Sequence, residues 1–162
     1  MEQTAVSQFT KDFFKEFAVS KDQLVTVEAK ATLVDVARLM RQKHVGNVLV
    51  CDVKNGKNVP IGIVTDRDVT IETLGQNVEP KTVSVADIMT RSPATAKTSD
   101  DVFAMIAKMK ENGVNRLPVV NESGEAIGIV TSKKLVQCLI QGLQDLSSLA
   151  SAQHKKEQSV RH

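Results

Sequence analysis

The sequence contains no tryptophan and no tyrosine, and four of its five phenylalanines lie within the first seventeen residues. The rest of the chain therefore lacks the aromatic platform that single-stranded nucleic acids usually stack on. The formal net charge is only +2, so no general attraction to nucleic acid or to an anionic membrane is expected. We expect neither a nucleic-acid nor a membrane partner.

Cysteine is also scarce, and long apolar runs are missing. Cys51 and Cys138 lie far apart, with no CxxC spacing and no neighbouring histidine. This pattern predicts two buried, reduced thiols rather than a disulfide or a metal site. No segment is typical of a signal peptide or long enough to span a bilayer, so a cytoplasmic location is expected.

The chain does contain an internal repeat. Residues 24–53 align with residues 93–122 without a gap, so that Thr26 falls on Thr95 and Met40 on Met109. After the loop at residues 54–60 the offset falls from 69 to 66, and the phrase IGIVT at 61–65 then matches the same phrase at 127–131. A duplicated supersecondary unit is predicted, in which each copy needs the other to bury its apolar face.

Each copy has the pattern of a β-α-β-β-α unit. Apolar residues at helical spacing predict the first helix of each copy, with Thr98–Asp101 supplying the cap of the second-copy helix. Ser84 is expected to cap a short helix that runs through Met89. The apolar positions of the two helices are Leu33, Val36, Ala37 and Met40 in the first copy, and Val102, Met105, Ile106 and Met109 in the second. The expected strands are 25–27, 47–52 and 61–64, then 94–96, 116–121 and 127–130, and the final helices are 66–75 and 132–146.

The two ends of the chain differ from the repeat. Phe9, Phe13, Phe14 and Phe17 would lie on one face of a helix over residues 1–17, whose polar face mixes acidic and basic side chains. This mixture favours a helix that packs on a core or a dimer over one that lies on a membrane. The predicted organisation is a helix at 1–17, one unit at 18–76, a second unit with a linker helix at 77–147, and a frayed polar tail at 148–162.

Several phrases carry a family resemblance: HVGNVLV at 44–50, GIVTDRDV at 62–69, DIMTRSPATA at 87–96 and GVNRLPVV at 113–120. Together they resemble a tandem pair of cystathionine-β-synthase (CBS) domains, a Bateman module, over residues 18–147. The resemblance implies an α/β (α+β) fold in which two pseudo-twofold-related units pack through their sheets. It also implies clefts for adenosine-containing ligands and a homodimer.

Thr65 and Asp68 have two interpretations, which can coexist. Thr-x-x-Asp at a helix start is the layout of a capping box, which needs no ligand. A fixed carboxylate can also accept hydrogen bonds from both hydroxyls of a ribose. Asp68 resembles the ribose-binding aspartate of nucleotide-binding CBS domains, and Thr65 resembles the hydroxyl residue beside it.

The resemblance implies further site residues. Phosphates would lie near a helix N-terminus with added basic side chains, and the adenine would lie against the residues that follow the linker. The implied phosphate residues are Asn115, Arg116 and Lys133, with Arg67 as a further candidate, and the implied adenine pocket is Pro93, Ala94 and Thr95, with Gly46 and Asn47 nearby. The opposite cleft, around Thr131 and Lys134, lacks a ribose acceptor, so one good nucleotide site is expected.

The sequence therefore predicts a regulatory protein that senses AMP, ADP or ATP and requires no cofactor. It does not predict an enzyme, because His44 has no acidic or cysteine partner at a recurrent spacing. Two alternatives stay open. The chain could be a dimerisation or partner-binding module, with a protein target that the sequence does not name. It could also bind another adenosyl ligand such as S-adenosylmethionine or NAD(H), although basic residues disfavour a sulfonium cation.

Overall fold

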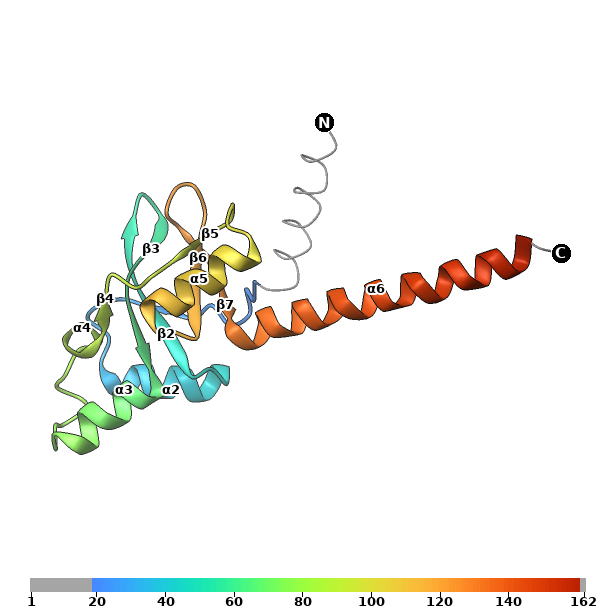
Figure 1. Cartoon of the computed structure of the whole chain (residues 1–162). Helices are drawn as coiled ribbons and strands as arrows, with labels where there is room; N and C mark the ends of the chain where they lie inside the picture. Colours follow the sequence, from blue (N-terminus) through green and yellow to red (C-terminus); the bar gives the residue numbers. More distant parts are fainter. Residues whose placement is uncertain (1–18, 161–162) are drawn as a thin grey trace.

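The computed structural model describes residues 19–160, and the side chains of residues 19–148. Two small sheets lie at its centre, one with the strand order β1-β2-β3-β4 and one with the order β5-β6-β7 (Figure 1). The elements of the first half are β1 (Thr26–Val27), α2 (Leu33–Lys43), β2 (Asn47–Lys54), β3 (Lys57–Thr65), α3 (Asp66–Thr70), a π-helical turn η1 (Ile71–Gly75) and α4 (Val85–Ile88). Those of the second half are β4 (Thr90–Arg91), β5 (Ala96–Lys97), α5 (Val102–Asn112), β6 (Arg116–Val120), β7 (Ala126–Thr131) and α6 (Ser132–Val160). The expected α+β pair of repeated units is confirmed.

Each sheet has helices on one face and the other sheet on its opposite face. Side chains alternate along β2, so Val48 and Val50 point into a core with α2 and α4, while Leu49 and Cys51 contact Ala126 of β7. In the second unit, α5 and α6 cover the sheet through Met105, Met109, Leu135 and Cys138, among others. The central layer between the sheets is therefore shared by both units.

Both cysteines are buried and free, as the sequence predicted. Burial raises the pKa of Cys51 to about 11. Burial also raises the pKa of Cys138, although the nearby Lys134 charge acts in the opposite direction. Both thiols are therefore protonated and unreactive near neutral pH.

The units exchange strand segments. β4, which leads into the second unit, pairs antiparallel with β3 of the first, with Arg91 opposite Gly62 and Thr90 opposite Ile63. Ser20, which leads into the first unit, pairs antiparallel with Ile129 of β7 through N–H···O distances of 2.9 and 3.2 Å. Each sheet is thus completed by the chain that enters the other unit. Val85 and Met89, which were predicted to belong to the second unit, lie in the core of the first.

This exchange explains the glycine of the repeated phrase IGIVT. A Cβ atom at Gly62 would overlap the side chain of Met89, and one at Gly128 would overlap the side chain of Val19. Met89 directly precedes β4, and Val19 directly precedes Ser20, so both overlapping residues lie next to an exchanged segment. Glycine is needed here for close approach of two strands, because neither residue has a positive φ.

We expect Gly62→Ala and Gly128→Ala each to lower the free energy of unfolding by about 1–3 kcal/mol, since the added methyl group overpacks the junction. Gly142→Ala is the matched control, because a Cβ atom there meets nothing within 4 Å in the middle of α6. It should raise stability by up to about 1 kcal/mol. Urea titrations followed by circular dichroism would measure all three. Unchanged midpoints for the first two variants would contradict the explanation.

The structure differs from the sequence prediction at several places. β4 was not predicted, β5 begins two residues after the start of the strand expected at 94–96, and β2 and β3 extend into the loop expected at 54–60. The helix expected over 66–75 is an α-helix only through Thr70, after which Thr73 donates its hydroxyl to the Val69 carbonyl within the π turn. The tail expected to fray continues α6 as helix to Val160. Ala37 and Ile106, expected on the apolar core faces, are exposed.

The helix predicted over residues 1–17 lies outside the described residues. Within the described part of the chain, no helix is both long enough and apolar enough to cross a membrane.

Candidate functional site

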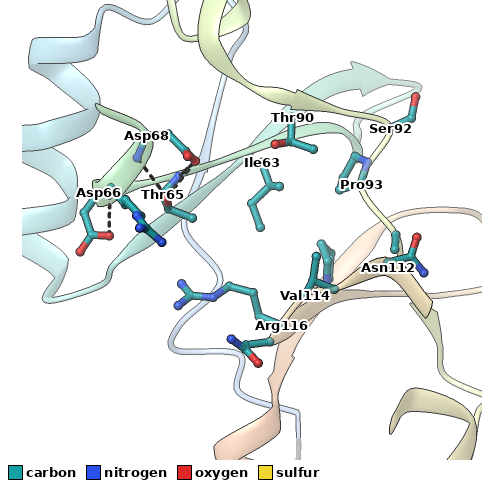
Figure 2. A pocket seen from close by; sticks show the side chains of 14 residues that line it. Ile63, Thr65, Asp66, Asp68, Thr90, Ser92, Pro93, Asn112, Val114 and Arg116 are labelled. Atoms are coloured by element: carbon teal, nitrogen blue, oxygen red, sulfur yellow. Dashed lines mark hydrogen bonds between the residues drawn. The ribbon is translucent and has the colours of Figure 1, made fainter. Parts of the chain in front are cut away.

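A cavity of about 530 Å³ lies between the two units. This volume is within the range that small-molecule sites in proteins occupy. Figure 2 shows its two walls, with Thr65, Asp66 and Asp68 on one side and Val114 and Arg116 on the other. The full lining is Ile63, Thr65, Asp66, Arg67, Asp68, Thr90, Ser92, Pro93, Ala94, Asn112, Val114, Asn115, Arg116 and Pro118.

Thr65 and Asp68 form the predicted capping box at the start of α3. Oδ2 of Asp68 accepts hydrogen bonds from the backbone N–H and the hydroxyl of Thr65, both at 2.8 Å. The N–H of Asp68 donates back to Oγ1 of Thr65 at 3.2 Å. The box uses one carboxylate oxygen, and no described residue donates to Oδ1. The capping role is therefore confirmed, and it leaves acceptor capacity on a carboxylate that lines the cavity.

Arg116 connects the two repeats. Its Nη1 donates to Oδ1 of Asn47 at 2.5 Å, and these residues occupy equivalent positions of the two copies, 69 residues apart. A residue can contact its own repeat equivalent only near the pseudo-twofold axis. Asn47 is only 7% exposed, and its Nδ2 has no partner among the described residues. In Figure 2 the guanidinium of Arg116 points across the cavity toward the wall that carries Thr65.

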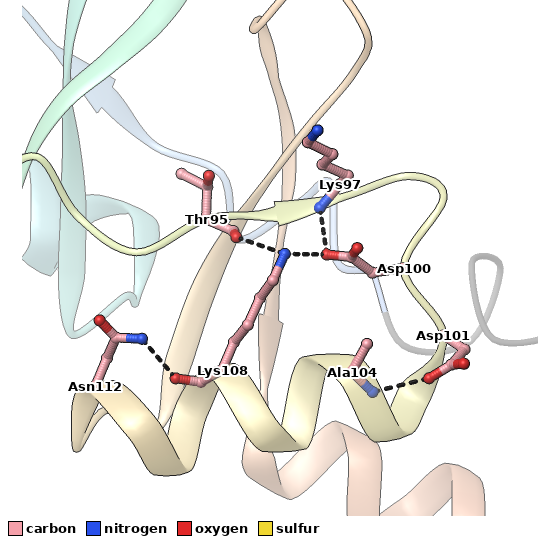
Figure 3. Close-up of polar contacts among 7 residues, drawn as sticks. All are labelled: Thr95, Lys97, Asp100, Asp101, Ala104, Lys108 and Asn112. Carbon is pink, nitrogen blue, oxygen red and sulfur yellow. Dashed lines mark hydrogen bonds and ion pairs between the residues drawn. The ribbon is translucent and has the colours of Figure 1, made fainter.

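A second polar cluster anchors the chain segment that follows the lining residues Pro93 and Ala94 (Figure 3). Nζ of Lys108 in α5 is 2.5 Å from Oδ2 of Asp100 and 3.4 Å from the carbonyl oxygen of Thr95. The same Oδ2 accepts the N–H of Lys97 at 2.8 Å. This cluster ties the chain that follows Pro93 and Ala94 to α5.

The pKa of Asp100 lies below its ordinary value. Burial alone would raise this pKa, but hydrogen bonds from Lys108 and from the Lys97 N–H, together with the two lysine charges, outweigh the burial. Because the pKa is lower in the folded state, the cluster stabilises the protein above the unfolded pKa of about 4. This contribution is lost as the pH falls through the lower folded value.

We therefore expect Asp100→Asn to lower the free energy of unfolding by about 1–3 kcal/mol at pH 7. The difference from the parent protein should shrink as the pH falls below about 4. Asp52→Asn is the control, because Asp52 forms only an exposed contact of 3.9 Å with Lys54 and should change little at any pH. Denaturation at a series of pH values measures both. A deficit for Asp100→Asn that does not vary with pH would contradict the ionic origin.

The structure brings seven of the eleven predicted site residues into the lining of this cavity and leaves four outside it. Gly46 instead lines a separate hollow beside the end of α2, and its carbonyl accepts the N–H of Asp66 at 3.2 Å. Asn47 is buried behind Arg116. Thr95 directs its carbonyl toward Lys108, and Lys133 is exposed in the first turn of α6. The residues inside are Thr65, Arg67, Asp68, Pro93, Ala94, Asn115 and Arg116.

Seven lining residues were not predicted from the sequence. Alternation along strands could have found two of them, since Ile63 shares a strand face with Thr65, and Pro118 shares one with Arg116. The others lie at strand and helix ends, where no periodicity indicates direction. They are Asp66, Thr90, Ser92, Asn112 and Val114.

At the equivalent helix start of the second copy, Thr131 and Lys134 form only one of the two hydrogen bonds of a capping box. The N–H of Lys134 donates to Oγ1 of Thr131 at 3.3 Å. The lysine side chain has no acceptor, so it cannot return the second bond of the box. The predicted inequality of the two clefts therefore has a structural counterpart at the two corners, while ligand binding at either one stays a prediction.

The family model of the CBS domain matches residues 15–74 and 85–141. The chain belongs to the CBS domain family. The matched ranges cover most of both repeats, in agreement with the resemblance seen in the sequence.

Relatives and solved structures extend this result. The chain is 34% identical over 119 residues to the uncharacterized protein MK0525 of Methanopyrus kandleri, covering 74% of this chain and 59% of that protein. It is 28% identical over 138 residues to the CBS domain-containing protein CBSCBSPB2 of Arabidopsis thaliana, covering 85% of this chain and 25% of that protein. The chain thus spans less than two thirds of these relatives.

The fold is similar to the crystal structure of the CBS-pair protein CBSX2 from Arabidopsis thaliana. The TM-score is 0.67 at 26% identity, covering 80% of this chain and 94% of that one. A structure of CBSX2 in complex with AMP matches with a TM-score of 0.62 at 26% identity, covering 78% of this chain and 94% of that one.

Within the described residues, no group of three or more His, Cys, Asp or Glu side chains could hold a metal ion.

Proposed function

We propose that this chain is a regulatory, non-catalytic module that binds AMP, ADP or ATP in the cavity between its two CBS units. The observation that carries the proposal is a carboxylate with one oxygen left free by the described residues and a guanidinium, which lie on opposite walls of a cavity of about 530 Å³. Oδ2 of Asp68 caps α3 and Oδ1 is unpaired among the described residues, while Arg116 points in from the opposite wall.

The ribose is assigned to the Thr65–Asp68 corner. Two vicinal hydroxyls can donate to one carboxylate, and hydrogen bonds to a charged group contribute roughly 1.5–3 kcal/mol each when shielded from water. The capping box supports this role, because it holds the carboxylate in one orientation before the ligand arrives. A similar protein, CBSX2, has been crystallised with AMP, which supports an adenosine ligand.

The adenine and phosphates are assigned by the chemistry of the remaining lining. Ile63, Pro93 and Val114 provide apolar contacts for a planar base. Arg116 and Arg67 are the two cations of the lining, and they suit a phosphate better than the sulfonium of S-adenosylmethionine. The neighbouring carboxylate of Asp66 repels phosphate, so we assign the phosphates to the Arg116 side.

Asp68→Ala should weaken AMP binding at least about tenfold, which corresponds to losing one interaction of 1.4 kcal/mol. It should also lower stability by about 1 kcal/mol through loss of the cap. Asp87→Ala is a matched control, because Ser84 and Asp87 form the same capping box at α4, with distances of 2.9 and 2.6 Å, and neither residue lines the cavity. Calorimetric titration with AMP and thermal melts measure both effects. Equal affinity losses for the two variants, or stability losses alone, would leave Asp68 with only its capping role.

Arg116→Met should weaken AMP about tenfold and leave adenosine binding unchanged, since only AMP carries a phosphate. This change also leaves the Asn47 oxygen unpaired, so the titration with adenosine reports any general damage to the cleft. Arg67→Met, beside Asp66, and Lys133→Met, exposed outside the lining, are controls that should weaken AMP much less. Titrations of each variant with AMP, ATP, S-adenosylmethionine and adenosine give the comparison. An equal loss for AMP and adenosine would indicate general damage to the cleft.

If ligand-free protein shows no heat and no thermal shift with any of these compounds, the nucleotide proposal is wrong. The remaining function is then that of a dimerisation or partner-binding module. For the nucleotide-sensing function, we propose that occupancy acts on a protein target or on a homodimer through the packing of the two units.

A further inference from the structure

The surface of α6 carries a row of large apolar side chains. Val136, Ile140, Leu143 and Leu146 are 54%, 50%, 67% and 64% exposed. Their spacing of three or four residues places them on one side of the helix. Single exposed apolar residues are ordinary on protein surfaces, whereas a contiguous row indicates a contact surface. We call these four residues the α6 stripe.

The stripe begins at the body of the protein and leads away from it. At its base, Val136 also lines an apolar groove of about 440 Å³ between α5 and α6, together with Ile106 and Leu139. Figure 1 shows α6 projecting as a long straight helix well beyond the two sheets. The described residues therefore offer no partner for the outer part of the stripe.

The stripe is uncharged. Between Leu135 and Ser148 the only charged residue is Asp145, and it lies on the opposite side of α6 from Ile140. Only an apolar surface gains free energy by covering such a stripe. Residues 1–18 can supply such a surface, since Phe9, Phe13, Phe14 and Phe17 would lie on one face of a helix.

We propose that residues 1–18 of the same chain form a helix that packs antiparallel to α6 and covers the α6 stripe with its phenylalanine face. The direction follows from the bridge between Ser20 and Ile129, which is antiparallel. Moving backward from Ser20 therefore corresponds to moving forward along β7, toward Ser132 where α6 begins. Residues 1–18 enter the described fold close to the base of the stripe.

Length and charge agree with this occupant. A helix of 17 residues is about 25 Å long, and the ten steps from Val136 to Leu146 rise about 15 Å. The segment can thus reach the end of the stripe without a linker. Opposite the phenylalanine face, Lys11 and Lys15 mix with acidic residues and stay in water.

The absence of tryptophan and tyrosine allows a clean test. Leu143→Trp places the only tryptophan of the chain on the α6 stripe, and Gln141→Trp places it on the opposite, exposed side. In the otherwise intact chain, we expect Trp emission from position 143 to lie at shorter wavelength than from position 141, with severalfold weaker quenching by acrylamide. Adding Phe13→Gln and Phe17→Gln to Leu143→Trp should abolish this difference, because the covering face is lost.

Two controls separate the possible occupants. Lys11→Gln with Lys15→Gln, on the other face of the segment, should leave the emission unchanged. The shift should also persist on dilution, with a monomer mass by light scattering at the lowest concentration. An exposed spectrum at position 143, or insensitivity to the phenylalanine changes, overturns the proposal. A shift that disappears on dilution as the mass falls from two chains to one also overturns it, because a second copy then covers the stripe.

Discussion

The reciprocal exchange of strand segments is the constraint on which the structure depends. Residues on the path into one unit complete the sheet of the other, at β4 against β3 and at Ser20 against β7. Neither sheet is whole without the chain of its neighbour, so the two units are expected to fold and unfold as one. The exchange also requires Gly62 and Gly128, because any side chain there would occupy the space of the incoming segment.

The same exchange builds the cavity. Once β4 has paired with β3, the chain continues through Ser92, Pro93 and Ala94, which line the cavity before β5 begins. The wall that carries Pro93 and Ala94 is therefore set by the linker rather than by either unit alone, whereas Val114 and Arg116 of the second unit face Thr65 and Asp68. The cluster of Lys108, Asp100 and the Thr95 carbonyl then holds this wall against α5. A ligand that contacts both walls would act directly on the packing between the units, which gives occupancy a physical route to a regulatory output.

Duplication has left the two halves similar in backbone and different in chemistry. Asn47 and Arg116 are equivalent residues that meet near the axis, yet one is a buried amide and the other a cation that reaches the cavity. Asp68 closes its capping box, whereas Lys134 at the matching corner cannot. The guanidinium of Arg116 has five N–H donors and gives one of them to Asn47, so it could bind a phosphate in the cavity and keep its contact on the axis that relates the units.

The sequence by itself determined the repeated β-α-β-β-α units and the caps at Thr65, Ser84 and Asp101. These features depend on neighbouring residues and on periodicity, which a sequence displays directly. Only the tertiary structure decided which predicted site residues meet. Strand pairing and linker path set the distances between residues far apart in the chain, so they excluded Thr95 and Lys133 from the cavity lining and added Thr90 and Asn112 to it. The sequence also did not predict that α6 continues to Val160. Its last residues are polar, and a helix can continue through polar residues without the apolar periodicity from which helices are predicted.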